Sequence, residues 1–133
     1  MAAVKVGAMN DDAPTVAVVD DDRSVLESIE DLLKSVGYNV RSYSSADALL
    51  VSDTLQTVDC LITDICLPGT GGLELERHAR QQRPELPVIL LTARDEAWNQ
   101  AQQLVSTQAG RILFRKPVDG EALLAAIKAV ATR

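Results

Sequence analysis

Three consecutive aspartates, Asp20, Asp21 and Asp22, directly follow the apolar run VAVV at 16–19. Adjacent carboxylates repel one another, and a carboxylate resists burial unless a cation or a hydrogen-bond donor compensates its charge. A divalent cation such as Mg²⁺, which takes oxygen ligands, would provide that compensation. One of the aspartates could instead cap a following helix and interact favourably with its dipole. The stretch therefore predicts a cation site, a helix cap, or both.

Polar residues that could act on a phosphoryl group follow three further apolar runs. Asp64 follows VDCLIT, Thr92 follows PVILL, and Lys116 follows RILFR. Taken alone, Asp64 could open a turn, Thr92 could be a cap, and Lys116 could be a solvated surface charge. Taken together with the acidic stretch, they suit phosphoryl transfer to a carboxylate. Asp64 would attack phosphorus beside a bound cation, while Lys116 and Thr92 would interact with the phosphoryl oxygens.

This chemistry requires a scaffold that brings the ends of four apolar runs together. Short apolar runs predict strands at 16–19, 38–43, 58–63, 87–91 and 111–115. Helices are predicted at 25–36, 73–82, 96–107 and 121–131, and a short helix through Leu50 is expected to be capped by Ser44 or Ser45. Gly37 is expected to end the first helix. Five such units predict an α/β fold with a doubly wound parallel sheet and helices on both faces. Such sheets bind ligands at the carboxyl ends of their strands, where the candidate residues fall.

Length and composition are typical of one globular domain. The chain has 133 residues, 47% of them hydrophobic and 24% charged, and no apolar run is long enough to cross a bilayer. Residues 1–14 lack periodicity and are expected to form a flexible tail, with the domain at 15–133. No export signal is recognisable, so a cytoplasmic location is expected. The net charge of −6 disfavours direct binding to nucleic acid.

Three other reactive side chains are expected to have ordinary roles. Cys60 and Cys66 are expected to be free thiols, because disulfides are rare in cytosolic proteins. His78 is expected on a solvated helix face, because no second metal ligand lies at helical spacing from it.

The motifs VVDDD, ITDICLPGTGG, LLTA and RKP occur in this order, and together they resemble the receiver domain of bacterial two-component response regulators. The resemblance covers about residues 15–131. It implies a flavodoxin-like fold with strand order 2-1-3-4-5, and it implies that Asp64 is the phosphoacceptor. The ligands it implies for Mg²⁺ or Mn²⁺ are Asp20, Asp21, Asp64 and the main-chain carbonyl of Cys66. Asp22 is then left to cap the first helix.

Further roles follow from the same resemblance. The phosphoryl-binding and switch residues that it implies are Thr92, Ala93, Lys116 and Pro117, with a cis peptide between the last two. Phosphorylation would draw the Thr92 hydroxyl inward and repack the face built from the fourth helix, the fifth strand and the fifth helix, where partners bind. Cys66 and Arg94, which lie two residues after Asp64 and Thr92, would tune the lifetime of the phosphoryl group.

Two segments depart from the family pattern. The family usually carries an aromatic residue three positions before the lysine, whereas this chain has Leu113 there and Phe114 one position later. Because side chains alternate across a strand, the ring moves to the other face of the sheet. The sequence therefore leaves open whether the aromatic part of the switch operates. The segment 94–110 is rich in glutamine, so the fourth helix is expected to be shifted or mobile.

The resemblance implies a signalling domain and not an enzyme, with only slow autodephosphorylation. The phosphoryl group would come from a sensor histidine kinase or a phosphotransfer protein. The output would be a downstream effector or an output domain absent from this chain, which is therefore either a stand-alone regulator or the receiver part of a transcription factor. The dimer state is open, with a phosphorylation-dependent homodimer as one option.

Two alternatives remain at this point. One is a receiver-like interaction module that works without phosphorylation. The other is a magnesium-dependent phosphohydrolase with an aspartyl-phosphate intermediate. The second is disfavoured because Cys66 stands where haloacid-dehalogenase relatives carry a second aspartate that acts as acid and base.

Overall fold

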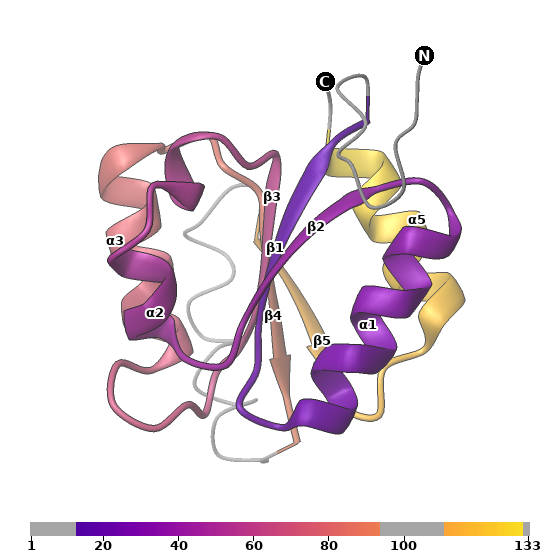
Figure 1. The fold of residues 1–133 in the computed structure, drawn as a ribbon, viewed down its shortest axis with the longest axis horizontal. Coiled ribbons are helices and arrows are strands. Elements are labelled where there is room, and N and C mark those ends of the chain that lie inside the picture. The colour runs from indigo at the N-terminus through magenta and orange to yellow at the C-terminus, as the bar shows by residue number, and fades with distance from the viewer. Residues whose placement is uncertain (1–12, 94–110, 132–133) are drawn as a thin grey trace.

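The computed structural model describes residues 13–93 and 111–131 (Figure 1). These residues contain one parallel sheet in the order β2-β1-β3-β4-β5. Its strands are β1 (Thr15–Val19), β2 (Asn39–Tyr43), β3 (Cys60–Asp64), β4 (Val88–Thr92) and β5 (Arg111–Arg115). The helices are α1 (Arg23–Ser35), α2 (Ala46–Leu50), α3 (Gly72–Gln82) and α5 (Gly120–Val130), with a 3₁₀ turn η1 (Thr54–Gln56). The predicted α/β fold and strand order are confirmed.

Some predictions fall on other parts of the chain. The helix expected at 96–107, Arg94 and most of the expected tail lie outside the described residues. Within the described ranges, no helix is both long and apolar enough to span a lipid bilayer.

The third strand begins two residues later than the sequence predicts. The turn η1 was not expected, and the N–H groups of Thr57 and Val58 both donate to the carbonyl of Thr54. The chain is therefore still turning at Val58, and the extended conformation starts at Cys60. Val58 is nevertheless fully buried, which explains why the apolar pattern predicts it to be part of the strand.

Local signals at both ends of α1 determine its length. The carboxylate of Asp22 accepts hydrogen bonds from the N–H groups of Ser24 at 3.0 Å and Val25 at 3.4 Å, so the predicted cap is confirmed. At the other end, Gly37 has φ +96°, which only glycine adopts without strain, and its N–H donates to the carbonyl of Lys34. The helix thus starts directly after the acidic stretch.

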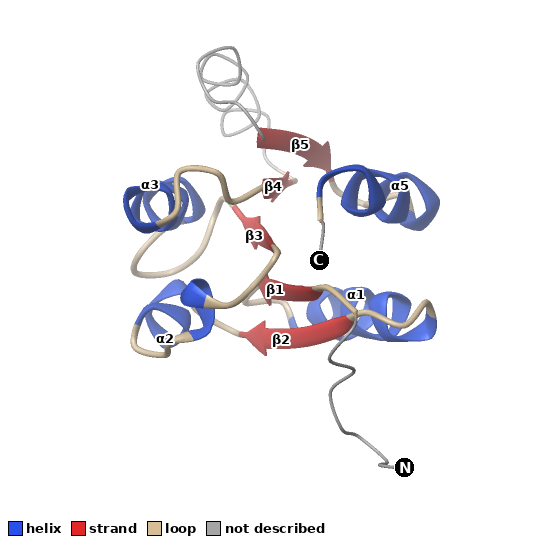
Figure 2. Cartoon of the chain, turned by 90° about the horizontal axis from the view of Figure 1, so that it is seen from above, coloured by secondary structure: helices blue, strands red, loops and turns tan. Residues whose placement is uncertain are grey.

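Helices cover both faces of the sheet, as Figure 2 shows in the view from above. Ala17 and Val19 face a cluster that includes Leu49 of α2 and Leu75 of α3. Val16 and Val18 face a second cluster built with α1 and α5, whose buried members include Ile29, Leu33, Leu123 and Ile127. Full burial of such a side chain contributes about 1.5–3 kcal/mol. The sheet is therefore the central layer of the fold, with a buried cluster on each face.

Strand register brings the predicted residues to one edge of the sheet. Val19 pairs with Thr63, so Asp20 and Asp64 are the next residues on neighbouring strands. Asp64 in turn pairs with Leu91, the residue before Thr92. Thr92 pairs with Arg115, the residue before Lys116. The parallel arrangement thus collects these side chains at the carboxyl ends of the strands.

Candidate phosphoacceptor and metal site

The site is built around an acidic cluster, by which we mean Asp20, Asp21 and Asp64. Each can offer one carboxylate oxygen such that all three oxygens lie within 4.8 Å of one another. Asp20 is fully buried and Asp64 is only 6% exposed, whereas Asp21 is exposed. Carboxylate oxygens at this spacing are the donor set that Mg²⁺ and Mn²⁺ prefer. The acidic cluster therefore fits a divalent cation that is reached from the solvent side at Asp21.

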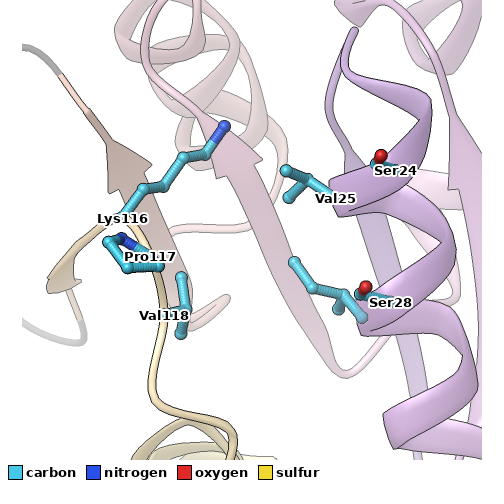
Figure 3. Close-up of a pocket in the computed structure, with 7 residues that line it drawn as sticks. Ser24, Val25, Ser28, Lys116, Pro117 and Val118 are labelled. Carbon is cyan, nitrogen blue, oxygen red and sulfur yellow. The ribbon is translucent and has the colours of Figure 1, made fainter.

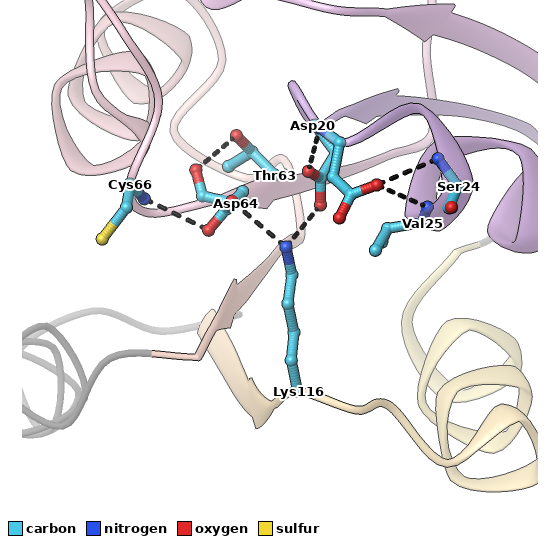
Figure 4. Close-up of polar contacts among 8 residues, drawn as sticks. Asp20, Ser24, Val25, Thr63, Asp64, Cys66 and Lys116 are labelled. Carbon is cyan, nitrogen blue, oxygen red and sulfur yellow. Dashed lines mark hydrogen bonds and ion pairs between the residues drawn. The ribbon is translucent and has the colours of Figure 1, made fainter.

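Lys116 compensates the two buried carboxylates (Figure 4). Its Nζ lies 2.8 Å from Asp20 Oδ2 and 3.1 Å from Asp64 Oδ2. The main-chain N–H of Asp22 also donates to Asp20 Oδ1 at 2.9 Å. Buried charges are tolerated when they are paired and hydrogen-bonded in this way. The ammonium group thus lies between the acidic residue after β1 and the last residue of β3.

Burial and neighbouring charges act in opposite directions on the ionisation of the site. Burial raises the pKa of Asp64, although the N–H of Cys66 and the charge of Lys116 partly oppose this effect. For Lys116, burial acts to lower the pKa, but the hydrogen bond to Asp20 and the charges of Asp64 and Asp20 outweigh it and raise the pKa. Lys116 therefore stays an ammonium ion at neutral pH.

The loop after Asp64, residues 65–71, is held against its carboxylate and is called the acceptor loop below. The N–H of Cys66 donates to Asp64 Oδ1 at 3.2 Å. The N–H of Gly72 donates to the carbonyl of Ile65 at 2.9 Å and closes the base of the loop. A Cβ added at Gly72 would lie 2.1 Å from the carbonyl oxygen of Asp64. Only glycine permits this approach of α3 to β3. The glycine-rich sequence alone does not show why glycine is required at this position.

The other predicted phosphoryl-binding residues lie at or directly after the ends of β4 and β5. Thr92 ends β4 with no exposed surface, and its carbonyl accepts a hydrogen bond from the N–H of Lys116 at 2.9 Å. Ala93 follows it and is exposed. The Lys116–Pro117 peptide is cis, as the resemblance implies. Cys66 is half-buried beside Asp64 and is a free thiol, as is the buried Cys60.

Leu113 and Phe114 lie on opposite faces of the sheet. Leu113 packs against the cluster that includes α2 and α3. Phe114 packs against the cluster that includes α1 and α5. The predicted alternation along β5 is therefore confirmed, and the ring of Phe114 is on the face away from the position where the family usually carries its aromatic residue.

An apolar groove of about 260 Å³ lies beside the acidic cluster (Figure 3). One wall is α1, with Val25 and Ile29, and the other is the segment from Lys116 to Val118. Lys116 belongs to both the groove and the ion pairs described above. Any molecule that approaches Asp64 along α1 would therefore meet an apolar surface next to the ammonium group.

Two residues near the site were not predicted from the sequence. Thr70, in the acceptor loop, donates a hydrogen bond from its Oγ1 to Asp47 Oδ1 of α2 at 2.7 Å. These residues are 23 positions apart. Thr70 lies within the motif ITDICLPGTGG, but the motif gives it no role, and Asp47 belongs to none of the motifs. Their contact depends on how α2 and α3 pack side by side, which no local sequence signal reports.

Comparisons with known proteins agree with this geometry. A family model described as the response regulator receiver domain matches residues 16–128. The chain is 31% identical over 122 residues to the response regulator protein TodT of Pseudomonas putida, which covers 91% of this chain and 52% of TodT. It is 35% identical over 130 residues to the transcriptional regulatory protein TdiR of Thauera aromatica, which covers 97% of this chain and 54% of TdiR. The chain thus spans about half the length of these curated relatives.

Solved structures show the same fold. A response regulator receiver domain protein from Clostridium thermocellum has a TM-score of 0.79 at 27% identity, covering 89% of this chain and 94% of that chain. The BeF3-activated receiver domain of DrrB, from Thermotoga maritima, has a TM-score of 0.75 at 29% identity, covering 91% of this chain and 99% of that chain. With the family match over residues 16–128, these likenesses show that the chain belongs to the response regulator receiver domain family.

Proposed function

We propose that Asp64 accepts a phosphoryl group from a sensor histidine kinase or a phosphotransfer protein, with Mg²⁺ or Mn²⁺ bound at the acidic cluster. The observation that supports this most directly is the position of Lys116 Nζ between Asp20 and Asp64. It places a positive charge beside Asp64, which is the last residue of the central strand β3 and a member of the acidic cluster. The main-chain carbonyl of Cys66 is proposed as a further metal ligand.

The transfer is a substitution at phosphorus. A carboxylate oxygen of Asp64 forms a bond to phosphorus as the P–N bond of the donor phosphohistidine breaks, and the electron pair of that bond leaves with the imidazole. Lys116 and the Thr92 hydroxyl bind oxygens of the phosphoryl group. A bound divalent cation would neutralise part of the charge on the other oxygens. No general base is needed, because Asp64 attacks as a carboxylate.

The consequence for signalling is a change of surface. Thr92, with Ala93, is proposed to move toward the phosphoryl group and repack the face formed by the fourth helix, β5 and α5, which would bind a downstream effector or an output domain. TdiR is named a transcriptional regulatory protein, which supports an output in transcription.

The domain is proposed to span 15–133 and to act in the cytoplasm, with phosphorylation-dependent dimerisation as a further proposal. Cys66 and Arg94 are proposed to set how fast water removes the phosphoryl group. Autodephosphorylation is proposed to be slow.

The test is covalent labelling with a small acyl phosphate and Mg²⁺, read by intact mass. We expect one added phosphoryl group, no addition in Asp64→Asn, and no addition when the metal is chelated. Asp59→Asn is the matched control, because Asp59 immediately precedes β3 and lies outside the acidic cluster. Labelling that persists in Asp64→Asn would refute the assignment of the acceptor.

One second candidate has a specific observation in its favour. Leu113 on the α2 and α3 face leaves the switch without its usual aromatic residue, which is compatible with an interaction module that works without phosphate. In that case Asp64→Asn would bind the downstream partner as tightly as the unchanged protein. Continuous release of phosphate from small esters would instead support a phosphohydrolase.

A further inference from the structure

The acceptor loop carries two groups that the proposed chemistry uses. The N–H of Cys66 donates to Asp64 Oδ1 at 3.2 Å, and the carbonyl of the same residue is the proposed further metal ligand. Both groups are main-chain atoms, so their positions depend on the conformation of the loop and not on a side-chain rotamer. Whatever holds the loop therefore helps to determine the geometry around Asp64.

The inner part of the loop is held by packing and by its closure. Ile65 and Leu67 are buried in the cluster shared with α2 and α3. The N–H of Gly72 donates to the carbonyl of Ile65 at 2.9 Å. The outer part has no such packing, because Pro68 and Gly69 are exposed.

At this outer part the loop meets the carboxylate of Asp47. Thr70 Oγ1 donates to Asp47 Oδ1 at 2.7 Å. A Cβ added at Gly69, whose φ is +74°, would lie 3.0 Å from Asp47 Oδ2. One oxygen of Asp47 therefore accepts a hydrogen bond from the loop, and the other occupies the space that a side chain at position 69 would need.

Asp47 lies in a helix whose neighbouring residues are buried, and it is not needed to cap that helix. The cap of α2 is Ser45, whose side chain accepts from the N–H of Ala48 at 3.1 Å. Ala46 and Leu49, on either side of Asp47 in α2, are fully buried. The main chain of Asp47 is therefore anchored by its buried neighbours, and its exposed side chain links α2 to the loop.

We propose that Asp47 and Thr70 are positioning residues for phosphoryl transfer, whose hydrogen bond holds the acceptor loop in the conformation that directs the main chain of Cys66 at Asp64. This inference rests on the proposed function, since it concerns the same site. Neither residue touches the reacting atoms, and neither belongs to the acidic cluster. The alternative is that the hydrogen bond contributes only to general stability.

The experiment compares Thr70→Val with Thr70→Ser. Valine keeps the shape of threonine without the hydroxyl, and serine keeps the hydroxyl. Neither variant changes the charge near the metal site. Mg²⁺ affinity is measured by titration calorimetry, and the labelling rate at limiting Mg²⁺ is measured by intact mass with a small acyl phosphate. We expect both to fall about fivefold in Thr70→Val, as for the loss of one net hydrogen bond, and to remain near the original values in Thr70→Ser.

Two further variants separate positioning from stability. Ser35→Ala removes a hydrogen bond of 2.7 Å to the carbonyl of Leu32, also at an exposed position, and is expected to leave Mg²⁺ affinity unchanged. Asp47→Ala combined with Thr70→Val is expected to be no worse than the single Thr70→Val variant, because the two side chains act through one contact.

The outcomes distinguish this inference from the proposed function. If the unchanged protein neither binds Mg²⁺ nor accepts a phosphoryl group, both fail. If the unchanged protein binds Mg²⁺ and accepts a phosphoryl group, and Thr70→Val has the same Mg²⁺ affinity and labelling rate, only the inference fails. The inference also fails if Thr70→Ser is as impaired as Thr70→Val, or if Ser35→Ala shows the same loss.

Discussion

At the scale of single residues, the three adjacent aspartates have three different environments. Asp20 is fully buried and paired with Lys116 at 2.8 Å. Asp21 is exposed, and Asp22 caps α1. Their mutual repulsion is therefore offset separately: by an ammonium ion, by water or a bound cation, and by main-chain N–H groups at the start of a helix.

The different environments of Asp21 and Asp22 predict different effects when each is substituted. Asp22→Ala should lower the free energy of unfolding by about 1 kcal/mol, because the helix cap is lost, while Mg²⁺ affinity stays almost unchanged. Asp21→Asn should change stability by no more than about 0.5 kcal/mol but weaken Mg²⁺ binding at least tenfold. Urea unfolding without metal and calorimetric titration with Mg²⁺ measure the two quantities. Equal weakening of Mg²⁺ binding in both variants would contradict the assignment of Asp21 to the metal and Asp22 to the helix cap.

Lys116→Met should be one of the most destabilising changes at the site. It leaves the buried carboxylates of Asp20 and Asp64 without the ammonium group that they share. The free energy of unfolding is therefore expected to fall by about 3 kcal/mol. Added Mg²⁺ should restore part of this loss, because it compensates the same charges. Urea unfolding with and without Mg²⁺ tests both points. Lys128→Met, at an exposed position in the last turn of α5, is the control and should change stability little.

The raised pKa of Asp64 predicts how stability depends on pH in the absence of metal. Burial is the main cause of the rise above the ordinary value of 3.8. The folded protein therefore binds this proton more tightly than the unfolded chain does, and Asp64 lowers stability as the pH rises through the range between the two pKa values. The full penalty applies above the folded pKa and is absent below the unfolded one.

Asp64→Asn should accordingly be more stable than the unchanged protein at pH 7 in chelator. The difference should shrink toward zero near pH 3, where the aspartate is protonated in both states. Urea unfolding at a series of pH values measures it, and Asp31→Asn, at an exposed position of α1, serves as the control. A variant that is less stable than the unchanged protein at pH 7 would show that the pairing with Lys116 outweighs burial.

At the scale of elements, the sequence predicted what depends on local pattern. The buried strands read as apolar runs, and Gly37 and Asp22 mark the ends of α1 by known local geometry. The turn η1 was missed because a single turn of helix has no periodicity. The Asp47–Thr70 contact was missed because it depends on packing between segments that are far apart in sequence. The acidic cluster was predictable because parallel strands align their carboxyl ends.

The junction between β3 and α3 yields a prediction at this scale. Gly72→Ala would place a Cβ 2.1 Å from the carbonyl oxygen of Asp64, so α3 must move away from β3. A loss of about 2–4 kcal/mol in unfolding free energy is expected, together with weaker Mg²⁺ binding. Gly71→Ala is the matched control, because its nearest contact would be 3.4 Å, an ordinary separation. Equal stability of the two variants would contradict this account of the junction.

At the scale of the whole molecule, the acidic cluster connects metal binding with folding. The net charge is −6 with the acidic cluster included, and without its three aspartates 16 acidic side chains still outnumber 13 basic ones. The three carboxylates of the cluster meet only in the folded state, because β1 and β3 must pair to bring them together. A cation that binds the cluster therefore binds the folded protein and not the unfolded chain.

Mg²⁺ should consequently raise the melting temperature in a saturable, concentration-dependent way. At a concentration 100 times the dissociation constant, the stabilisation is about 2.7 kcal/mol, which for a domain of this size corresponds to a rise of about 8–12 °C. Differential scanning calorimetry over a Mg²⁺ series measures it. KCl at matched ionic strength is the control, because screening of the net charge alone would also raise stability slightly. A shift that KCl reproduces, or one that Asp21→Asn retains in full, would mean that the cation acts on the overall charge and not at the cluster.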